Sequence, residues 1–153
     1  MLPEFDGIFQ WQWARAMRGP SNEDEVDAVA ADAAGNVYLS GKFEDSLAID
    51  GDGNTIRSRG LGDMMVVKYD QAGNWQWTRH FGGPGDDNIF DATCDQDGNL
   101  VLSGWFAGEV QFGGTSLTAM GGQDMVVLKM SPAGEVLWAR QYGGGADDAG
   151  NEV

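Results

Sequence analysis

Two short segments of this chain carry the closely spaced carboxylates that a calcium ion prefers. Asp50 and Asp52 lie in Asp-Gly-Asp-Gly-Asn, and Asp95 and Asp97 lie in Asp-Gln-Asp-Gly-Asn. These four aspartates are the candidate calcium ligands, because calcium is bound by carboxylate and carbonyl oxygens. Neither segment has the glutamate that ends an EF-hand loop. Capping of a hairpin turn is the favoured alternative, since the matching turn at 32–36 has only the first aspartate.

Acidic pairs recur after glycine-rich segments. Asp86-Asp87 and Asp147-Asp148 follow such segments, and Glu23-Asp24-Glu25 occupies the matching place in the first copy. Two carboxylates about 5 to 10 Å apart, one with a raised pKa, perform glycoside hydrolysis, so a glycan-processing enzyme is one candidate function. A solvated acidic rim is favoured instead, because a pair that recurs in every repeat is typical of architecture rather than of an active site.

Side chains for other kinds of catalysis are scarce. His80 is the only histidine and Cys94 the only cysteine, and no Gly-x-Ser-x-Gly segment is present. A hydrolytic triad or a transition-metal centre is therefore very hard to assemble within one chain. The sequence predicts no catalytic residue and no cofactor, with calcium as the open alternative.

A tryptophan and an arginine spaced two residues apart occur three times. Residues two apart on a strand share a face, so each guanidinium can lie over or beside its indole, a contact worth about 0.5 to 2 kcal/mol. Such pairs either pack sheets together or form aromatic platforms for carbohydrate. Their recurrence in register with the apolar pattern favours packing. The pairs are Trp13/Arg15, Trp77/Arg79 and Trp138/Arg140.

These motifs recur because the chain repeats itself about every 60 residues. Short apolar runs separated by Asp, Gly and Asn predict strands, and no segment has helical periodicity. Each repeat is predicted to contain four strands with a small β excursion between the second and the third. Four consecutive apolar residues in the third strand predict that both of its faces are covered. The predicted strands are 26–32, 36–43, 63–69 and 74–81, then 89–95, 99–106, 124–130 and 135–142.

The repeated segments resemble a known family. Gly-Asn-Val-Tyr-Leu-Ser-Gly at 35–41, its counterpart at 98–104, the Asp-Met-x-Val-x-Lys strands and Trp-x-Arg-x-Phe-Gly-Gly are similar to the bacterial β-propeller repeat family abbreviated SBBP. The resemblance covers nearly the whole chain after Gly7. It implies an all-β propeller of four-stranded antiparallel blades, a secreted or cell-surface setting in a bacterium, and no enzymatic activity.

The number of repeats sets the expected domain organisation. Closed propellers have about 4 to 8 blades, whereas this chain supplies about two and a half, so oligomerisation or further sequence would complete the ring. We expect one repeat array over residues 1–153. Its parts are an orphan Trp-x-Arg strand at 7–18, blades at 26–82 and 89–143, and a truncated junction at 144–153.

Charge limits the partners. The formal net charge of −15 disfavours nucleic acid and anionic membrane surfaces. Residues 1–6 lack the pattern of a secretory leader, and no apolar run is long enough to insert into a membrane. The expected function is a non-enzymatic scaffold and binding module, with carbohydrate as the candidate ligand and a second copy of the chain as the expected partner. A self-assembling ring or fibre subunit is the alternative.

Overall fold

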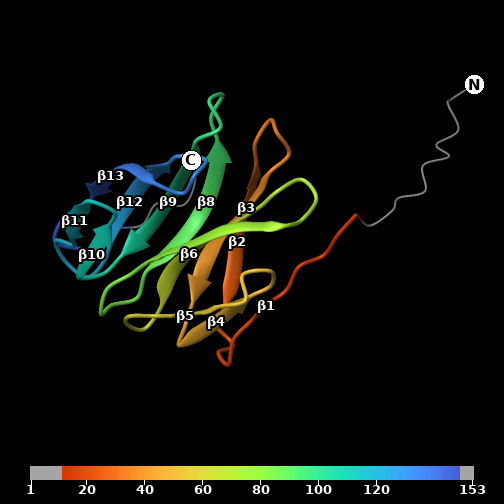
Figure 1. Ribbon diagram of the computed structural model, residues 1–153. Coiled ribbons are helices and arrows are strands. Elements are labelled where there is room, and N and C mark those ends of the chain that lie inside the picture. Colours follow the sequence, from red (N-terminus) through yellow and green to blue (C-terminus); the bar gives the residue numbers. More distant parts are fainter. Residues whose placement is uncertain (1–11, 149–153) are drawn as a thin grey trace, which may run out of the picture.

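The computed structural model describes residues 12–148, and the regular elements among them are all β-strands (Figure 1). Within this part of the chain, no helix has the length and hydrophobicity to span a membrane. The strands are β1 (Met17–Arg18), β2 (Glu25–Ala31), β3 (Val37–Phe43), β4 (Ser46–Ile49), β5 (Thr55–Arg57), β6 (Asp63–Tyr69), β7 (Trp75–Phe81), β8 (Asn88–Cys94), β9 (Leu100–Phe106), β10 (Glu109–Phe112), β11 (Thr115–Thr118), β12 (Asp124–Met130) and β13 (Val136–Tyr142).

Two four-stranded antiparallel sheets form the body of the protein. The first sheet has the order β2-β3-β6-β7, and the second sheet has the order β8-β9-β12-β13. Each of these strands begins and ends within about one residue of its predicted bounds. The all-β prediction is confirmed. The described residues form several antiparallel sheets and no closed ring.

Smaller elements flank the two sheets. The hairpins β4–β5 and β10–β11 occupy the places of the two predicted excursions. The predicted strand at 7–18 is regular only at β1, which pairs with β4 and not with a four-stranded sheet. Residues 7–11 of that prediction, and 149–153 of the predicted junction, lie outside the described residues.

Aspartate side chains cap the hairpin turns of both sheets. Asp32 Oδ1 accepts hydrogen bonds of 3.0 Å from the backbone N–H groups two and four residues later. Asp70 and Asp95 accept the same pair of bonds in their own turns. Gly35 has a φ of 80°, a left-handed conformation that favours glycine. The predicted Asp-x-x-Gly-Asn hairpins are confirmed.

The two sheets pack face to face around the main core. The hairpin β10–β11 contributes to this core at its outer edge, and β4–β5 covers the opposite face of the first sheet (Figure 1). The main core includes Tyr38, Met64, Val66, Leu102, Val110, Phe112, Val126 and Leu128; Leu47, Ile49, Met65 and Val67 belong to the smaller one.

The third strands of the two sheets differ in burial. All residues of β6 are buried, whereas β12 alternates between buried and half-buried residues. The prediction that this strand is covered on both faces is therefore correct for β6 and wrong for β12. The first sheet has packed elements on both faces, but the second sheet leaves one face half-exposed. We call this the open face; it carries Met125, Val127, Lys129, Trp138, Arg140 and Tyr142.

Candidate functional site

The Trp-x-Arg pair of β7 donates hydrogen bonds from the first sheet to the second. Trp77 Nε1 donates a hydrogen bond to the carbonyl oxygen of Pro132 at 3.1 Å, and Arg79 Nε donates to that of Gly134 at 3.0 Å. Both acceptors lie in the turn between β12 and β13. The Arg79 guanidinium carbon is 5.5 Å from the centre of the Trp77 ring. Because Trp77 is only 8% exposed, its ring cannot serve as a carbohydrate platform.

The amino-terminal copy makes the same two bonds with the first sheet. Trp13 Nε1 donates to the carbonyl oxygen of Gln71 at 3.1 Å, and Arg15 Nε donates to that of Gly73 at 2.6 Å. Gln71 and Gly73 lie in the turn between β6 and β7, which is the counterpart of the turn between β12 and β13. We call this pair of bonds the latch. Its recurrence indicates that it packs one repeat against the next.

The third copy of the motif has no such acceptor among residues 12–148. Arg140 Nη1 donates to the carbonyl oxygen of Ala139, its own neighbour, at 3.3 Å. Trp138 is half-buried on the open face, and its Nε1 has no hydrogen-bond partner within the described residues. The donors of a third latch are therefore present, but residues 12–148 provide no acceptor for them.

The acidic pairs are not simply a solvated rim. Asp87 is fully buried, and its carboxylate oxygens accept backbone hydrogen bonds from Gly83 at 3.0 Å and Ala107 at 2.9 Å. Asp24 and Asp148 each accept one backbone hydrogen bond in the corresponding loops. The prediction of a solvated acidic rim is wrong for Asp87, because its carboxylate is buried and bonded to two backbone N–H groups.

Asp87 belongs to a cluster of ionisable side chains. Asp86 forms an ion pair with Lys42 at 2.9 Å, and His80 Nδ1 lies 3.5 Å from Asp63 Oδ2. Asp63 and Asp87 have no exposed surface, whereas the side chains of Asp86 and Glu44 are 31% and 30% exposed and both pair with Lys42 Nζ. A glycosidase needs two carboxylates that both contact substrate and have differing environments. Asp86 and Glu44 instead share one cation and are equally exposed, so this cluster does not have the arrangement of such a pair.

Burial of Asp87 predicts an unusual pH dependence of stability. Desolvation raises the pKa of Asp87 from 3.8 to about 6, and the nearby Asp63 and Asp86 charges also raise it. Between about pH 4 and about pH 6 the Asp87 carboxyl is therefore protonated in the folded protein but ionised in the unfolded chain. The free energy of unfolding should consequently fall as the pH rises from about 4 to about 6. Urea denaturation across this range measures the slope. The Asp87→Asn variant should have a flatter slope, and an equal slope would contradict the assignment.

The calcium candidates lie in two different turns. Asp50 and Asp52 lie in the turn between β4 and β5, and Asp95 and Asp97 lie in the turn between β8 and β9. Asp95 is already engaged: Oδ1 accepts two backbone hydrogen bonds, and Oδ2 pairs with Lys129 Nζ at 2.7 Å. Among the described residues, no group of three or more His, Cys, Asp or Glu side chains is placed to hold a metal ion. The contacts of Asp95 favour turn capping.

We expect calcium to have little effect on stability. A bound ion with a Kd far below its free concentration would add a few kcal/mol to the free energy of unfolding. Because the Asp95 oxygens are hydrogen-bonded to protein donors, the melting temperature should stay within about 1 °C when calcium is added or chelated. Differential scanning calorimetry gives this comparison. A rise of several degrees with calcium, lost in Asp95→Asn, would show that the site binds metal.

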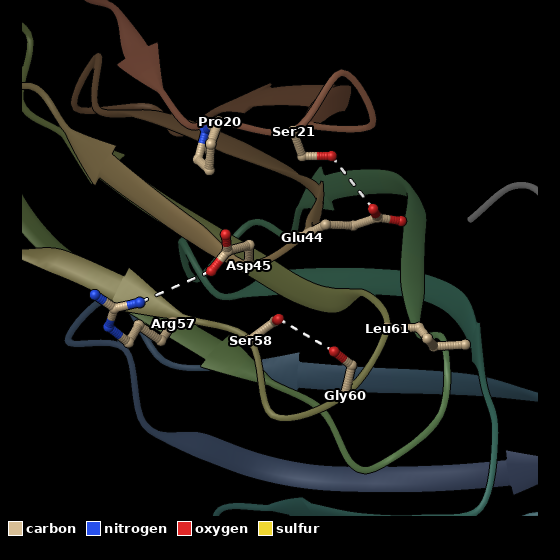
Figure 2. A pocket seen from close by; sticks show the side chains of 8 residues that line it. All are labelled: Pro20, Ser21, Glu44, Asp45, Arg57, Ser58, Gly60 and Leu61. Atoms are coloured by element: carbon tan, nitrogen blue, oxygen red, sulfur yellow. Dashed lines mark hydrogen bonds and ion pairs between the residues drawn. The ribbon is translucent and has the colours of Figure 1, made fainter.

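The hollow in Figure 2 is lined mainly by polar groups. Its residues come from the loop after β1, the turn between β3 and β4, the last residue of β5 and the segment that follows β5. The cavity has a volume of about 540 Å³. Ser21 donates a hydrogen bond to Glu44 at 3.2 Å, and Arg57 forms an exposed ion pair with Asp45 at 3.8 Å. None of the described residues that line the hollow is aromatic, so these residues do not provide the stacking surface expected for a sugar.

Comparison with known families and with curated proteins found no match to this chain.

Two buried aspartates have structural roles that the sequence did not predict. Asp63 and Asp124 begin the third strands, are fully buried, and each accept a backbone hydrogen bond from the residue four positions earlier. Their recurrence before an apolar strand was the available signal.

Proposed function

We propose that this chain is a non-enzymatic scaffold of the β-propeller type from a secreted or cell-surface bacterial protein, with each four-stranded sheet serving as a blade. The latch carries this proposal. It is made twice, by the same donor atoms and to the same turn positions. The aromatic and cationic side chains of the repeat thus hold one unit against the next instead of facing a ligand.

The acidic residues support the same proposal. Asp24, Asp87 and Asp148 accept backbone hydrogen bonds in equivalent loops, and Asp32 and Asp95 cap equivalent turns. Carboxylates with fixed structural partners in each repeat are typical of architecture. A catalytic pair would need two differing environments beside one cleft.

An assay for glycan turnover tests this proposal against the enzymatic alternative. Wild-type protein and the Asp86→Asn variant are incubated with bacterial polysaccharides, and newly formed reducing ends are measured. Asp86 is an informative position because it is next to Asp87 in the chain and is one of the two solvent-accessible carboxylates that pair with Lys42, the other being Glu44. We expect no release by either protein. Release by the wild type that Asp86→Asn abolishes would contradict a non-enzymatic scaffold.

A further inference from the structure

The open face presents the same kinds of side chain as the packed face of the first sheet. Met64 and Val66 are fully buried against the second sheet, and their counterparts Met125 and Val127 are half-buried on the open face. Tyr142 of β13 is 53% exposed, whereas its counterpart Phe81 in the first sheet is 6% exposed. The open face is therefore an apolar blade surface that residues 12–148 do not cover as they cover the internal interface.

The polar groups of the open face also lack the partners of their counterparts. In the first sheet, Lys68 Nζ donates a 2.8 Å hydrogen bond to the carbonyl oxygen of Pro132 in the neighbouring sheet. The matching Lys129 instead pairs with Asp95 within its own sheet. Together with Trp138 and Arg140, Lys129 would supply the three donors that the internal interface uses.

The chain contains a turn that could accept hydrogen bonds from these donors. Such a turn needs two backbone carbonyl groups spaced two residues apart, and a glycine at positive φ that leaves space for the indole ring. The turn between β6 and β7 has this form, with Gln71, and with Gly73 at a φ of 78°. A Cβ on Gly73 would collide with Trp13, just as one on Gly134 would crowd Trp77. The turn between β12 and β13 belongs to the same sheet as Trp138, so the β6–β7 turn of a second copy is the fitting partner.

Within one chain, residues 12–24 occupy that partner surface. Trp13, Arg15 and Asp24 make the bonds for which Trp138, Arg140 and Asp148 are the counterparts. This cover is incomplete: a cavity of about 300 Å³ remains beside it, lined by residues that include Arg15, Val26, Leu39 and Met65. Val29, on β2, is 62% exposed.

We propose that the open face binds the first sheet of a second copy, with residues 136–148 taking the place of residues 12–24. Residues 12–24 then act as a removable cap on head-to-tail assembly. This inference rests on the proposed scaffold function. The exchange replaces two latch bonds with two equivalent ones, but it also breaks the β1–β4 pairing and the hydrogen bond from Asp50 N–H to the Ala16 carbonyl oxygen. Burial of the open face must therefore offset these losses. A head-to-tail contact either closes into a ring or extends into a filament.

Two matched variants test whether residues 12–24 block assembly and whether residues 136–148 drive it. Arg15→Ala weakens the cap, and Arg140→Ala removes the same side chain from the incoming copy. Light scattering after size exclusion, at about 0.15 M salt to screen the charge of −15, gives the mass. At equal concentration, the mass of Arg15→Ala should rise above that of wild type, and Arg140→Ala should have the mass of a single chain. If the two variants have the same mass, the proposal is overturned.

Mixing experiments test the two surfaces separately. The first mixing experiment uses a chain with four substitutions: Trp13→Ala, Arg15→Ala, Trp138→Ala and Arg140→Ala. Its first sheet is uncapped and its open face has no latch donors, whereas the internal latch of Trp77 and Arg79 is kept. Alone it should remain a single chain, and mixed with wild type it should form a 1:1 complex. If circular dichroism shows that this chain is unfolded, Arg15→Ala mixed with Arg140→Ala replaces it, and the mixture should contain complexes with both variants. Absence of complexes in the folded mixture would overturn the proposal, whereas failure of the scaffold function would show as release of reducing ends.

Discussion

The Trp77→Ala variant is expected to lose about 3 to 5 kcal/mol of the free energy of unfolding. Its indole is 8% exposed and lies between the two sheets. Truncation removes this packing, leaves a cavity, and deprives the carbonyl oxygen of Pro132 of a donor. The melting temperature should fall by about 6 to 20 °C. Urea denaturation, followed by circular dichroism, measures the change in free energy directly.

Trp138→Ala is the matched control for this prediction. It removes the same side chain at the equivalent position of the second sheet, where the indole is half-buried and makes no latch among the described residues. At concentrations where the protein is a single chain, the loss should be about 1 kcal/mol or less. Equal losses for Trp77→Ala and Trp138→Ala would contradict the role of the latch.

The Gly104→Ala variant is expected to lose about 2 to 3 kcal/mol, because the added Cβ would overlap the backbone carbonyl oxygen of Asn88. The β8–β9 pairing shifts register between Ile89 and Asp91, and this bulge brings the backbone of β8 close to Gly104. Backbone atoms on both strands must move to relieve the overlap. Urea denaturation again measures the loss.

Gly114→Ala provides the control for this second variant. A Cβ at Gly114 would have no neighbouring atom within 4 Å. Because Gly114 is exposed and its φ is outside the left-handed region, its replacement should change the free energy of unfolding by no more than about 0.5 kcal/mol. A Gly104→Ala protein as stable as Gly114→Ala would show that the bulge is not tightly packed.

The strands were predictable from the sequence because their signals are local. Short apolar patterns mark the strands, and Asp-x-x-Gly-Asn marks the turns before β3 and β9, so these two strands lie where the pattern places them. The shared face of Trp77 and Arg79 also followed from the two-residue period of a strand. These features depend on neighbouring residues in the chain and not on tertiary contacts.

The latch acceptors and the burial of Asp87 were not predictable in the same way. Pro132 and Gly134 accept through backbone carbonyls, which have no distinctive side chain, and they lie 55 residues from their donors. The position of Asp87 in a glycine-rich loop predicts an exposed side chain. In the structure the side chain is fully buried and accepts backbone hydrogen bonds from Gly83 and Ala107. The exposure of β12 depends on which sheet lies beside it, and its own composition does not determine this.

Hydrogen exchange of the tryptophan indole N–H groups, followed by NMR, tests most directly whether the latch joins the two sheets. In dilute single chains, the indole N–H of Trp77 should exchange slowly, because it is bonded to Pro132 inside the interface. The indole N–H of Trp138 should exchange fast, because it lies on the open face without a partner among the described residues. Fast exchange at both positions would contradict an interface held by Trp77.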